Sequence, residues 1–316
     1  MRMMKERVES RMSEIVAPDG RAYHLGLSAD ELAHNVFLVG DPARAAKVAS
    51  FFDHVLCEVS NREYRTYTGS YRGMPVSVIG TGIGADNVEI AFLEAYVLNE
   101  FNLETKFRKP VAVPLTLIRL GTSGGVQPDV PAGPLVISDY ALGLDSTGIY
   151  YDLPAPDDQT IVIENEAALL IDETIDSDSR FKGFVRPYAS KASSAVTSAL
   201  KDAALESGVS WESGITVTSP GFYGPSSRFI DGFSNTVPDI KITLSKLQVG
   251  EMRVLNMEME SSLLFHLARA VGYQAGTICP VISNPLKSDS LIDYEKVIDQ
   301  TIAIGLDAMT SLRGKS

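Results

Sequence analysis

Short apolar runs alternate along the chain with longer segments in which apolar residues recur every three or four positions. The short runs predict strands at residues 36–39, 55–59, 75–79, 117–120, 135–138, 215–218 and 275–282. The longer segments predict helices after residue 44 and at about residues 87–101, 165–175, 193–206, 261–271 and 292–312. No repeat and no Pro/Ser-rich linker interrupts this alternation. The pattern predicts one α/β domain with a mixed central sheet over residues 21–316, preceded by an N-terminal arm of residues 1–20.

The strand at residues 117–120 ends in a glycine-rich turn, which is the first candidate site. Residues 117–125 read Leu-Ile-Arg-Leu-Gly-Thr-Ser-Gly-Gly, so an apolar run carrying Arg119 gives way to glycines and hydroxyls. Backbone N–H groups are accessible in such a turn, which therefore predicts an anion pocket.

The same turn formally matches the Gly-x-Ser-x-Gly turn that presents the nucleophile of α/β hydrolases. In those enzymes the turn runs directly into a helix, whereas Pro128 and Pro131 follow here within a few residues. The only downstream histidine, His266, lies inside the helical pattern at 261–271. Ser123 is therefore not predicted to be a nucleophile.

Two other glycine-containing turns each lead from a strand into a helix. Gly40-Asp41-Pro42-Ala43-Arg44 places a proline in the first helical turn, where free N–H groups favour an anion. Arg44 can bind that anion or be an ordinary exposed helix arginine. Residues 80–85, Gly-Thr-Gly-Ile-Gly-Ala, do not fit a dinucleotide fingerprint, because the third glycine comes one position early and no acidic residue closes a following strand.

An acidic stretch and an aromatic loop complete the candidate chemistry. Glu258 and Glu260 alternate with methionines at period two before the helix at 261–271, so the carboxylates share one face. Acidic residues also occur at helix starts for electrostatic reasons alone. The loop at residues 220–228 combines Phe222 with Arg228, which suits a planar ring but also suits simple loop packing.

Composition limits the classes of partner. The formal net charge of −12 disfavours nucleic acid and anionic membrane, because the long-range field repels polyanions. Cys57 and Cys279 have no metal-ligand spacing with the four histidines, so no metal site is predicted. No apolar run approaches 18 residues and the N-terminus lacks the apolar core of a signal peptide, so we expect a soluble cytoplasmic protein.

Together these residues would form sites for an oxyanion, a polyol and a planar ring. A nucleoside and phosphate present these three groups together. In these residues the chain resembles the nucleoside phosphorylase superfamily, and within it the uridine phosphorylases. The resemblance runs from about Tyr23 to Asn284, and its motifs occur in order at residues 24–27, 40–44, 61–64, 81–84, 119–125 and 256–261. It implies a single-domain, three-layer α/β/α fold with a mixed central β-sheet.

The resemblance also implies a role for each matched residue. Phosphate would be bound by Gly40, Arg44, Arg119 and Thr122, with Arg62 supplied by a neighbouring subunit. Ribose would be bound by Glu258, Met259 and Glu260, with His24 of the partner meeting the 5′ hydroxyl. The base would contact Phe222, Ser226, Arg228 and Asn284.

The implied reaction is reversible phosphorolysis of the N-glycosidic bond. Inorganic phosphate is the co-substrate and the nucleophile, so no organic cofactor is expected. Because His24 and Arg62 would act in another subunit's site, at least a homodimer is expected. Arg119→Ala should then abolish phosphate-dependent turnover while the fold is retained.

Two departures from the family pattern fall at the base end. Uridine phosphorylases have a glutamine where this chain has Ser226, and an Asn-Arg pair where it has Asn284-Pro285. A carboxamide pairs with both N3–H and O4 of uracil, which one hydroxyl cannot do. The leading hypothesis is uridine phosphorolysis. The alternatives are a purine nucleoside phosphorylase, with Asn284 facing the purine edge, and a non-catalytic nucleoside-binding protein of the same fold.

Overall fold

The computed structural model describes residues 16–17, 19–285 and 292–313. Most of the predicted N-terminal arm, residues 1–15 and 18, lies outside the described residues. Contacts divide the chain into two compact units, unit 1 (Met1–Leu117) and unit 2 (Ile118–Ser316). Strand β7 (Thr116–Leu120) crosses the boundary in sequence. The expectation of a single domain stays a prediction.

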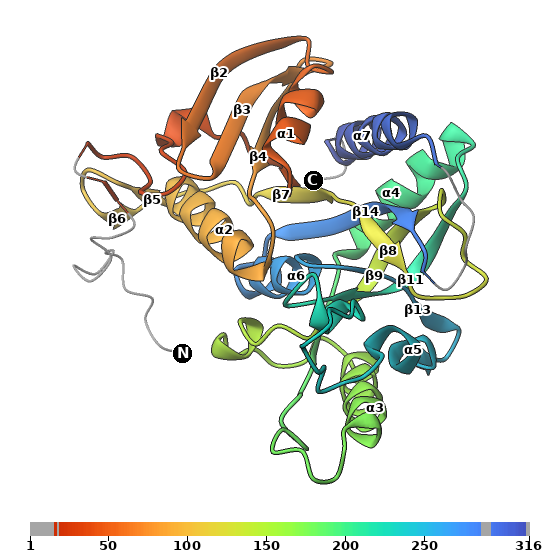
Figure 1. Ribbon diagram of the computed structural model, residues 1–316. Helices are drawn as coiled ribbons and strands as arrows, with labels where there is room; N and C mark the ends of the chain where they lie inside the picture. The colour runs from red at the N-terminus through yellow and green to blue at the C-terminus, as the bar shows by residue number, and fades with distance from the viewer. Residues whose placement is uncertain (1–15, 18, 286–291, 314–316) are drawn as a thin grey trace. The chain divides into compact units, whose positions relative to one another are not determined.

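Unit 1 contains a mixed sheet with the strand order β1-β4-β3-β2 (Figure 1). β1 (Asn35–Val39) pairs in parallel with β4 (Met74–Gly80), and β3 (Tyr64–Tyr71) pairs antiparallel with both β4 and β2 (His54–Asn61). The helix α1 (Pro42–Ala49) follows β1 and packs on β3 and β4. The helix α2 (Ala85–Glu100) follows β4, and a small hairpin of β5 (Phe101–Asn102) and β6 (Phe107–Arg108) comes next.

The predicted strands and helices of unit 1 are confirmed, and β3, which was not among the predicted strands, is an additional one. Gly69 lies inside the strand, and a Cβ at this position would come within 2.2 Å of the carbonyl oxygen of His54. The pairing of β2 with β3 shifts register between Val55 and Cys57 at the same place. The glycine therefore permits a close approach of two strands and does not mark a turn.

The sheet strands of unit 2 follow the order β10-β9-β11-β13-β8-β14. The strands β9 (Leu135–Gly143), β11 (Trp211–Thr218) and β13 (Met252–Glu258) run parallel, and β10 (Tyr188–Lys191) runs antiparallel at the edge. The short strand β8 (Ser123–Gly125) joins β13 to β14 (Gln274–Ser283), and β12 (Gln248–Val249) pairs with β13. The expectation of a mixed sheet is confirmed.

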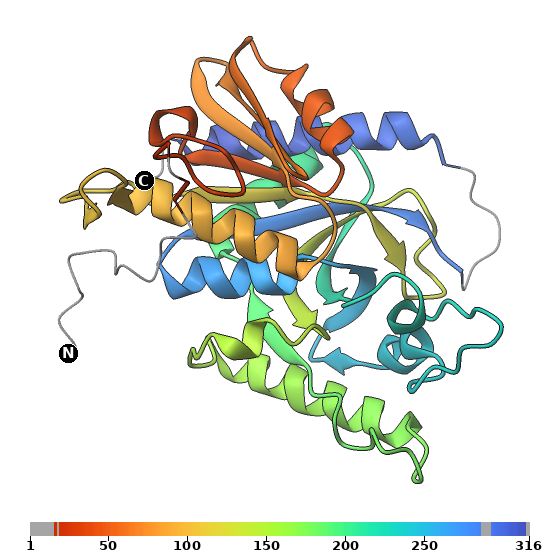
Figure 2. The same cartoon turned by 60° about the vertical axis from the view of Figure 1, so that its left-hand side comes forward.

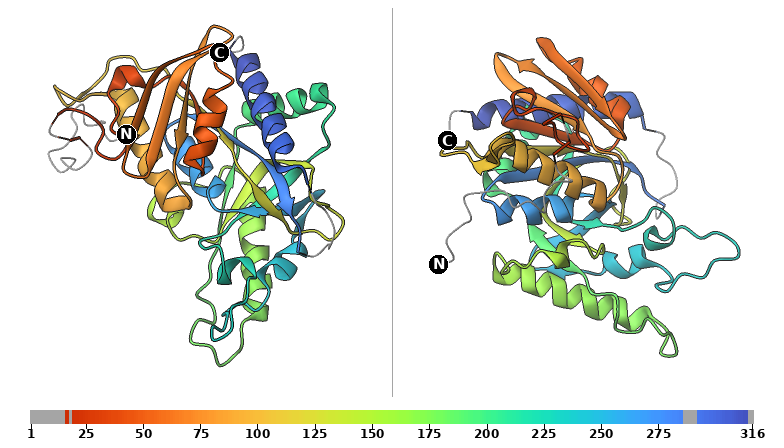
Figure 3. Two further views of the ribbon diagram at one scale, coloured as in Figure 1. Left: turned by 45° about the horizontal axis from the view of Figure 1, so that its top comes forward. Right: turned by 90° about the vertical axis from the view of Figure 1, so that its left-hand side faces the viewer.

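Helices cover both faces of the sheet in unit 2. α4 (Ser194–Ser207) and α7 (Tyr294–Leu312) lie side by side against β14 (Figures 1 and 3). α3 (Asp158–Thr174) and α5 (Ile240–Ser245) lie on the other side, while α6 (Ser261–Ala270) packs on β14 and β10 (Figure 2). The three short 3₁₀ helices of the described chain are Ala29–Glu31 in unit 1 and Gly148–Tyr150 and Gly224–Ser226 in unit 2.

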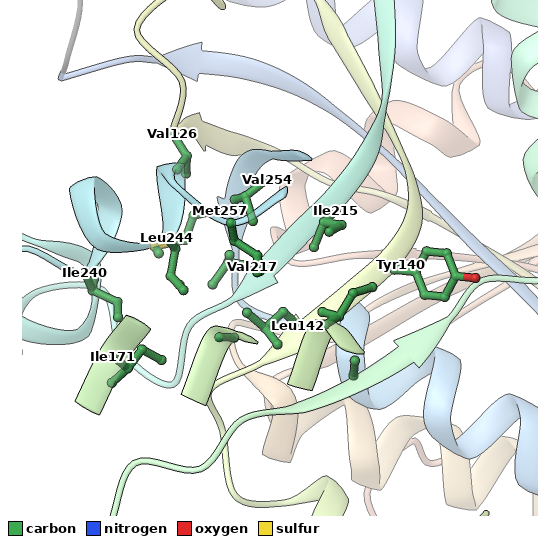
Figure 4. Close-up of a cluster of buried hydrophobic side chains, with 14 of the residues drawn as sticks. Val126, Tyr140, Leu142, Ile171, Ile215, Val217, Ile240, Leu244, Val254 and Met257 are labelled. Carbon is green, nitrogen blue, oxygen red and sulfur yellow. The ribbon is translucent and has the colours of Figure 1, made fainter. Parts of the chain in front are cut away.

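The core of unit 2 that matters for the site lies between α3, α5 and the strands β9, β11 and β13 (Figure 4). Met257 of β13 packs there with Val217 and Val254, and α5 contributes Ile240 and Leu244. The methionine side of β13 therefore faces the core, as the period-two pattern predicts, and the following carboxylate is directed to the other face.

The segment at residues 143–160 is fixed to unit 2 by a buried carboxylate. Asp145 is 5% exposed and accepts hydrogen bonds from Tyr188 Oη at 3.0 Å and Ser262 Oγ at 2.9 Å. The loop tip is nevertheless exposed, since Tyr150 is 83% accessible. None of the helices in the described parts of the chain is both long and apolar enough to cross a membrane.

Candidate active site

A buried cluster of charged residues lies where β7, β13 and the start of α6 meet. Arg119 places Nη1 3.1 Å from an oxygen of Glu258, and Nη2 forms an ion pair with Glu260. Nη1 also donates to Sγ of Cys279 at 3.0 Å. Arg119, Glu258 and Glu260 are only 3–4% exposed. We call Arg119, Glu258, Glu260 and Cys279 the Arg119 cluster.

Glu258 is held mainly by the protein itself. Its carboxylate accepts hydrogen bonds from Thr218 Oγ1 at 2.7 Å and from the backbone N–H groups of Glu260 and Ser261 at 3.0 and 3.1 Å. These N–H groups belong to the first turn of α6, where a negative charge is favoured. With Arg119 added, the acceptor positions of this carboxylate are filled. The helix-start interpretation therefore describes Glu258 well.

Glu260 differs from Glu258 in its backbone position. The strand β13 ends at Glu258, and Glu260 is the N-cap residue of α6. The two carboxylates therefore do not share a strand face as the alternation predicted, yet they converge on the same guanidinium. Met259, between them, is half-buried.

Charge and burial explain the electrostatics of this cluster. Burial lowers the pKa of Arg119, but the carboxylates of Glu260 and Glu258 raise it more, so the guanidinium stays charged. Burial raises the pKa of the Cys279 thiol to about 12, although Arg119 lowers it, so this group is a neutral thiol. One cation and two carboxylates meet here, so the cluster offers acceptors to hydroxyl donors and can stabilise a cationic sugar.

The glycine-rich turn that the sequence predicts after β7 is in part a short strand. Ser123–Gly125 form the short strand β8, and Ser123 is buried, with Oγ donating to the carbonyl of Pro280 and accepting from Asn256 Nδ2. Thr122 precedes β8 and is half-buried. Gly121 leaves space for the cluster, because a Cβ there would lie 1.8 Å from Arg119 Nη1 and 2.6 Å from Cys279 Sγ.

The loop that follows β11, residues 219–239, is the ring loop. Cζ of Arg228 lies 3.8 Å from the centre of the Phe222 ring, and Nη1 of Arg228 donates to the backbone carbonyl of Phe222 at 2.7 Å. One face of this half-exposed ring is thus covered by its own arginine. Ser226 is buried, and its hydroxyl donates to Gly221 O at 2.7 Å and lies 3.0 Å from Ser219 Oγ, so it closes the loop.

Asn284 follows β14 and supports the backbone next to β8. Its Nδ2 donates at 2.7 Å to the carbonyl oxygens of Gln127 and Val130. A Cβ at Gly125 would lie 2.7 Å from the same nitrogen, so the amide fills the space beside that glycine. The next residue, Pro285, is exposed.

In unit 1 the predicted phosphate residues lie at the start of α1. Gly40 follows β1, and Arg44 is in the first turn of α1 with 9% of its surface exposed. Pro42 occupies the first turn as predicted, while Asp41 caps the helix by accepting from Ala43 N at 2.8 Å.

His24 and Arg62 are each fixed by contacts within unit 1. His24 Nδ1 lies 2.7 Å from Oε1 of Glu94, whose carboxylate also accepts from the backbone N–H groups of His24 and Leu25. The buried carboxylate is an acceptor, so it favours the proton on Nδ1 and directs Nε2 away from it. Arg62 is exposed in the β2–β3 turn with φ of 52°, and its Nη2 donates to Tyr23 Oη at 3.1 Å.

The sequence interpretation missed three residues that contact predicted ones, namely Thr218, Cys279 and Glu94, and a buried lysine, Lys241. For Glu94 a signal was available, since an acidic residue on the apolar side of the helix at 87–101 needs a partner. Within the described residues, no group of three or more His, Cys, Asp or Glu side chains is arranged to hold a metal ion.

Comparisons with known proteins agree with this architecture. The family model for the phosphorylase superfamily matches residues 35–306. The uridine phosphorylase of Thermococcus kodakarensis is 30% identical over 278 residues, which cover 86% of this chain and 80% of the relative. The uridine phosphorylase of Treponema pallidum is 32% identical over 286 residues, which cover 89% and 90%.

A solved structure gives the same result. The nucleoside phosphorylase of Trypanosoma brucei, described as showing uridine phosphorylase activity, matches with a TM-score of 0.82 at 30% identity and covers 94% of this chain and 99% of its own. The matched span includes β1, the Arg119 cluster and the ring loop. The chain therefore belongs to the phosphorylase superfamily.

Proposed function

We propose that the protein catalyses reversible phosphorolysis of a pyrimidine nucleoside, converting uridine and phosphate to uracil and ribose 1-phosphate. The observation that carries this proposal is the Arg119 cluster, in which one buried guanidinium lies between two carboxylates. The similarity to two uridine phosphorylases and to a nucleoside phosphorylase with uridine phosphorylase activity supports it.

The proposed reaction needs no nucleophile from the protein. A phosphate oxygen forms a bond to the anomeric carbon as the bond from that carbon to the base nitrogen breaks, and the electron pair leaves with the base. The sugar becomes transiently cationic and the base anionic. The protein contributes by holding the reactants in line and by stabilising these charges. Inorganic phosphate is the co-substrate, and no organic cofactor is part of the proposal.

The residues are assigned as follows within the proposal. Phosphate is bound by Gly40, Arg44, Arg119 and Thr122, because a guanidinium fork matches phosphate oxygens. Glu260 accepts the ribose hydroxyls and Met259 packs on the sugar. Glu258 positions the cluster, because its acceptor positions are already filled by Thr218, Arg119 and the start of α6.

At least a homodimer is part of the proposal, with His24 and Arg62 acting in the partner's site. Support for the role of His24 is its fixed ring, in which Glu94 holds Nδ1 and leaves Nε2 to meet a 5′ hydroxyl. A cytoplasmic location is also proposed, and the free thiols of Cys57 and Cys279 support a reducing compartment.

The purine alternative depended on Asn284 facing the edge of the base. The amide nitrogen of Asn284 is already bonded to two backbone carbonyls, which weakens that alternative.

The test is release of free base from uridine, cytidine, inosine and adenosine, measured with and without phosphate. We expect release from uridine that requires phosphate. Release without phosphate would mean hydrolysis, release from inosine but not uridine would mean a purine enzyme, and no release from any nucleoside would favour a binding protein.

A further inference from the structure

Lys241 is a lysine that the fold buries next to the ring loop. It is the second residue of α5, and the flanking residues Ile240 and Leu244 fix this helix in the core of unit 2 (Figure 4). The backbone N–H of Lys241 donates to Ser227 Oγ of the ring loop at 3.0 Å. Only 3% of the lysine is exposed, so its side chain is enclosed by protein.

The ammonium group of Lys241 lies beside the turn that follows Arg119. A Cβ built on Gly124 would lie 3.4 Å from Lys241 Nζ and 3.7 Å from the carbonyl oxygen of Ser283. Gly124 pairs with Met257 of β13 and with Ser283 of β14, so Nζ is close to the strands that carry the Arg119 cluster. The missing side chain of Gly124 leaves space in front of the ammonium group.

The backbone of Lys241 is held by Ser227 Oγ, while Nζ at the end of its side chain lies beside Gly124. Burial, together with the positive charge of Arg228, lowers the pKa of Lys241 to about 8, although the carboxylate of Asp239 raises it. Asp239 itself accepts hydrogen bonds from Ser227 Oγ and from Ile242 N. The largely enclosed position of Lys241 makes the charged form of this lysine costly, and a ligand that supplies an acceptor would lower that cost.

The neighbours of Lys241 indicate which part of a nucleoside supplies that acceptor. Arg228 of the ring loop is near enough to lower the pKa of Lys241, and the same arginine stacks on Phe222. The hydroxyl of Ser226 is already used within the loop. A pyrimidine base offers carbonyl oxygens as acceptors, and these oxygens gain negative charge as the glycosidic bond breaks. An ammonium group in contact with such an oxygen would bind the base and stabilise its departure.

We propose that Lys241 is a specificity-determining residue that donates a hydrogen bond from Nζ to a carbonyl oxygen of the base. It supplies the base-end cation that Pro285 and Ser226 do not. This inference rests on the proposed nucleoside phosphorolysis. An ammonium group donates and does not accept, so a carbonyl at the contacted position is selected over an amino group.

The test compares Lys241→Met with Lys246→Met, because Lys246 is an exposed lysine at the other end of the same helix. In Lys241→Met we expect kcat/KM for uridine to fall on the order of 10- to 100-fold, the range for losing a charged hydrogen bond. The KM for phosphate should stay unchanged, and Lys246→Met should match the wild type. Lys241→Arg should recover part of the activity.

Thio-substituted substrates identify the contacted oxygen. In the wild type, replacing that oxygen in 2-thiouridine or 4-thiouridine should lower kcat/KM, because sulfur is a weak acceptor. In Lys241→Met the same thio-analogue and uridine should become nearly equal. A residue that only supports the fold would lower activity with all three substrates by the same factor.

Calorimetric binding of uracil separates this inference from the proposed function. If the wild type shows no phosphorolysis but binds uracil more tightly than Lys241→Met, the proposed reaction fails and the role of Lys241 stands. If Lys241→Met equals Lys246→Met in uracil affinity and in kcat/KM, the role of Lys241 is overturned. A raised phosphate KM in Lys241→Met would also overturn it, and a wild type that binds no base would overturn both.

Discussion

Arg119 and Glu260 form an ion pair in the interior of unit 2, where the exposed fractions of the two residues are 4% and 3%. Because Glu258 contacts the same guanidinium, the pair is part of a cluster with one cation and two carboxylates. Removing Arg119 would leave two buried carboxylates, whereas removing the charge of Glu260 would leave one cation and one carboxylate.

Arg119→Ala should destabilise the fold as well as abolish phosphate-dependent turnover, because it leaves two buried carboxylates without a cation. We expect the free energy of unfolding to fall by about 3–5 kcal/mol, the usual range for breaking a buried ion pair. The sequence alone suggested that this variant would keep its fold. The burial of the cluster indicates that the variant also loses stability. Urea unfolding measures it.

Glu260→Gln is the matched variant, because Arg119 then faces Glu258 alone and the charges balance. Its unfolding free energy should change by no more than about 1 kcal/mol, while kcat/KM for uridine falls with the lost acceptor for ribose. Equal destabilisation by both variants would contradict this account of the cluster.

His24→Ala and Glu260→Gln should complement each other if His24 acts in the partner's site. A heterodimer of the two variants contains one site with both native residues and one site with neither. Purified through two different affinity tags, it should show about half the turnover of the wild-type dimer, since one of two sites is intact. A heterodimer as inactive as the two parent homodimers would place His24 in its own subunit's site.

Lys241 should make stability depend on pH in the alkaline range. Its pKa in the folded protein is about 8, below the ordinary value of 10.5, so the folded state loses this proton first. The destabilisation is fully present below pH 8 and is relieved as pH rises towards 10.5. At 1.36 kcal/mol per pKa unit it is on the order of 3 kcal/mol.

The stability of Lys241→Met measures this effect directly. The variant should have a higher Tm than the wild type at pH 7, and the difference should shrink between pH 8 and pH 10.5. Lys246→Met should show no such trend. A constant Tm difference across this range would contradict the low pKa of Lys241.

The two thiols should differ in reactivity. Burial raises the pKa of both cysteines, but Cys57 on β2 is half-buried whereas Cys279 is enclosed and contacts Arg119. Iodoacetamide at pH 8 should therefore add one group slowly, at Cys57, and a second only in urea. Mass spectrometry of the intact and digested protein identifies the sites. Rapid native alkylation of Cys279 would contradict its enclosure.

Apolar runs were sufficient to predict most strands and helices, because a buried segment must be apolar along its length. The strand β3 was missed because its Tyr, Arg, Thr and Ser residues do not form an apolar run and Gly69 resembles a turn signal. In space that glycine makes room for the carbonyl of His54. A contact between strands distant in sequence cannot be inferred from the local pattern.

At the site, the sequence predicted the residue types but not their contacts. Glu258 and Glu260 were identified, yet their convergence on Arg119 depends on β13 ending between them. Lys241 was not identified, because a lysine in a short amphipathic helix is usually exposed. Its burial depends on Ile240 and Leu244 docking in a core formed by other segments.

The ring loop and α5 form one continuous stretch, residues 219–245, while the Arg119 cluster is carried by β7, β13 and the start of α6. Substitutions within that stretch can alter the choice of base without disturbing the charge balance around Arg119. Selection can therefore act on the two ends of the substrate separately. Descendants of this protein could therefore acquire a different base preference through residues 219–245 while the residues around the sugar stay the same.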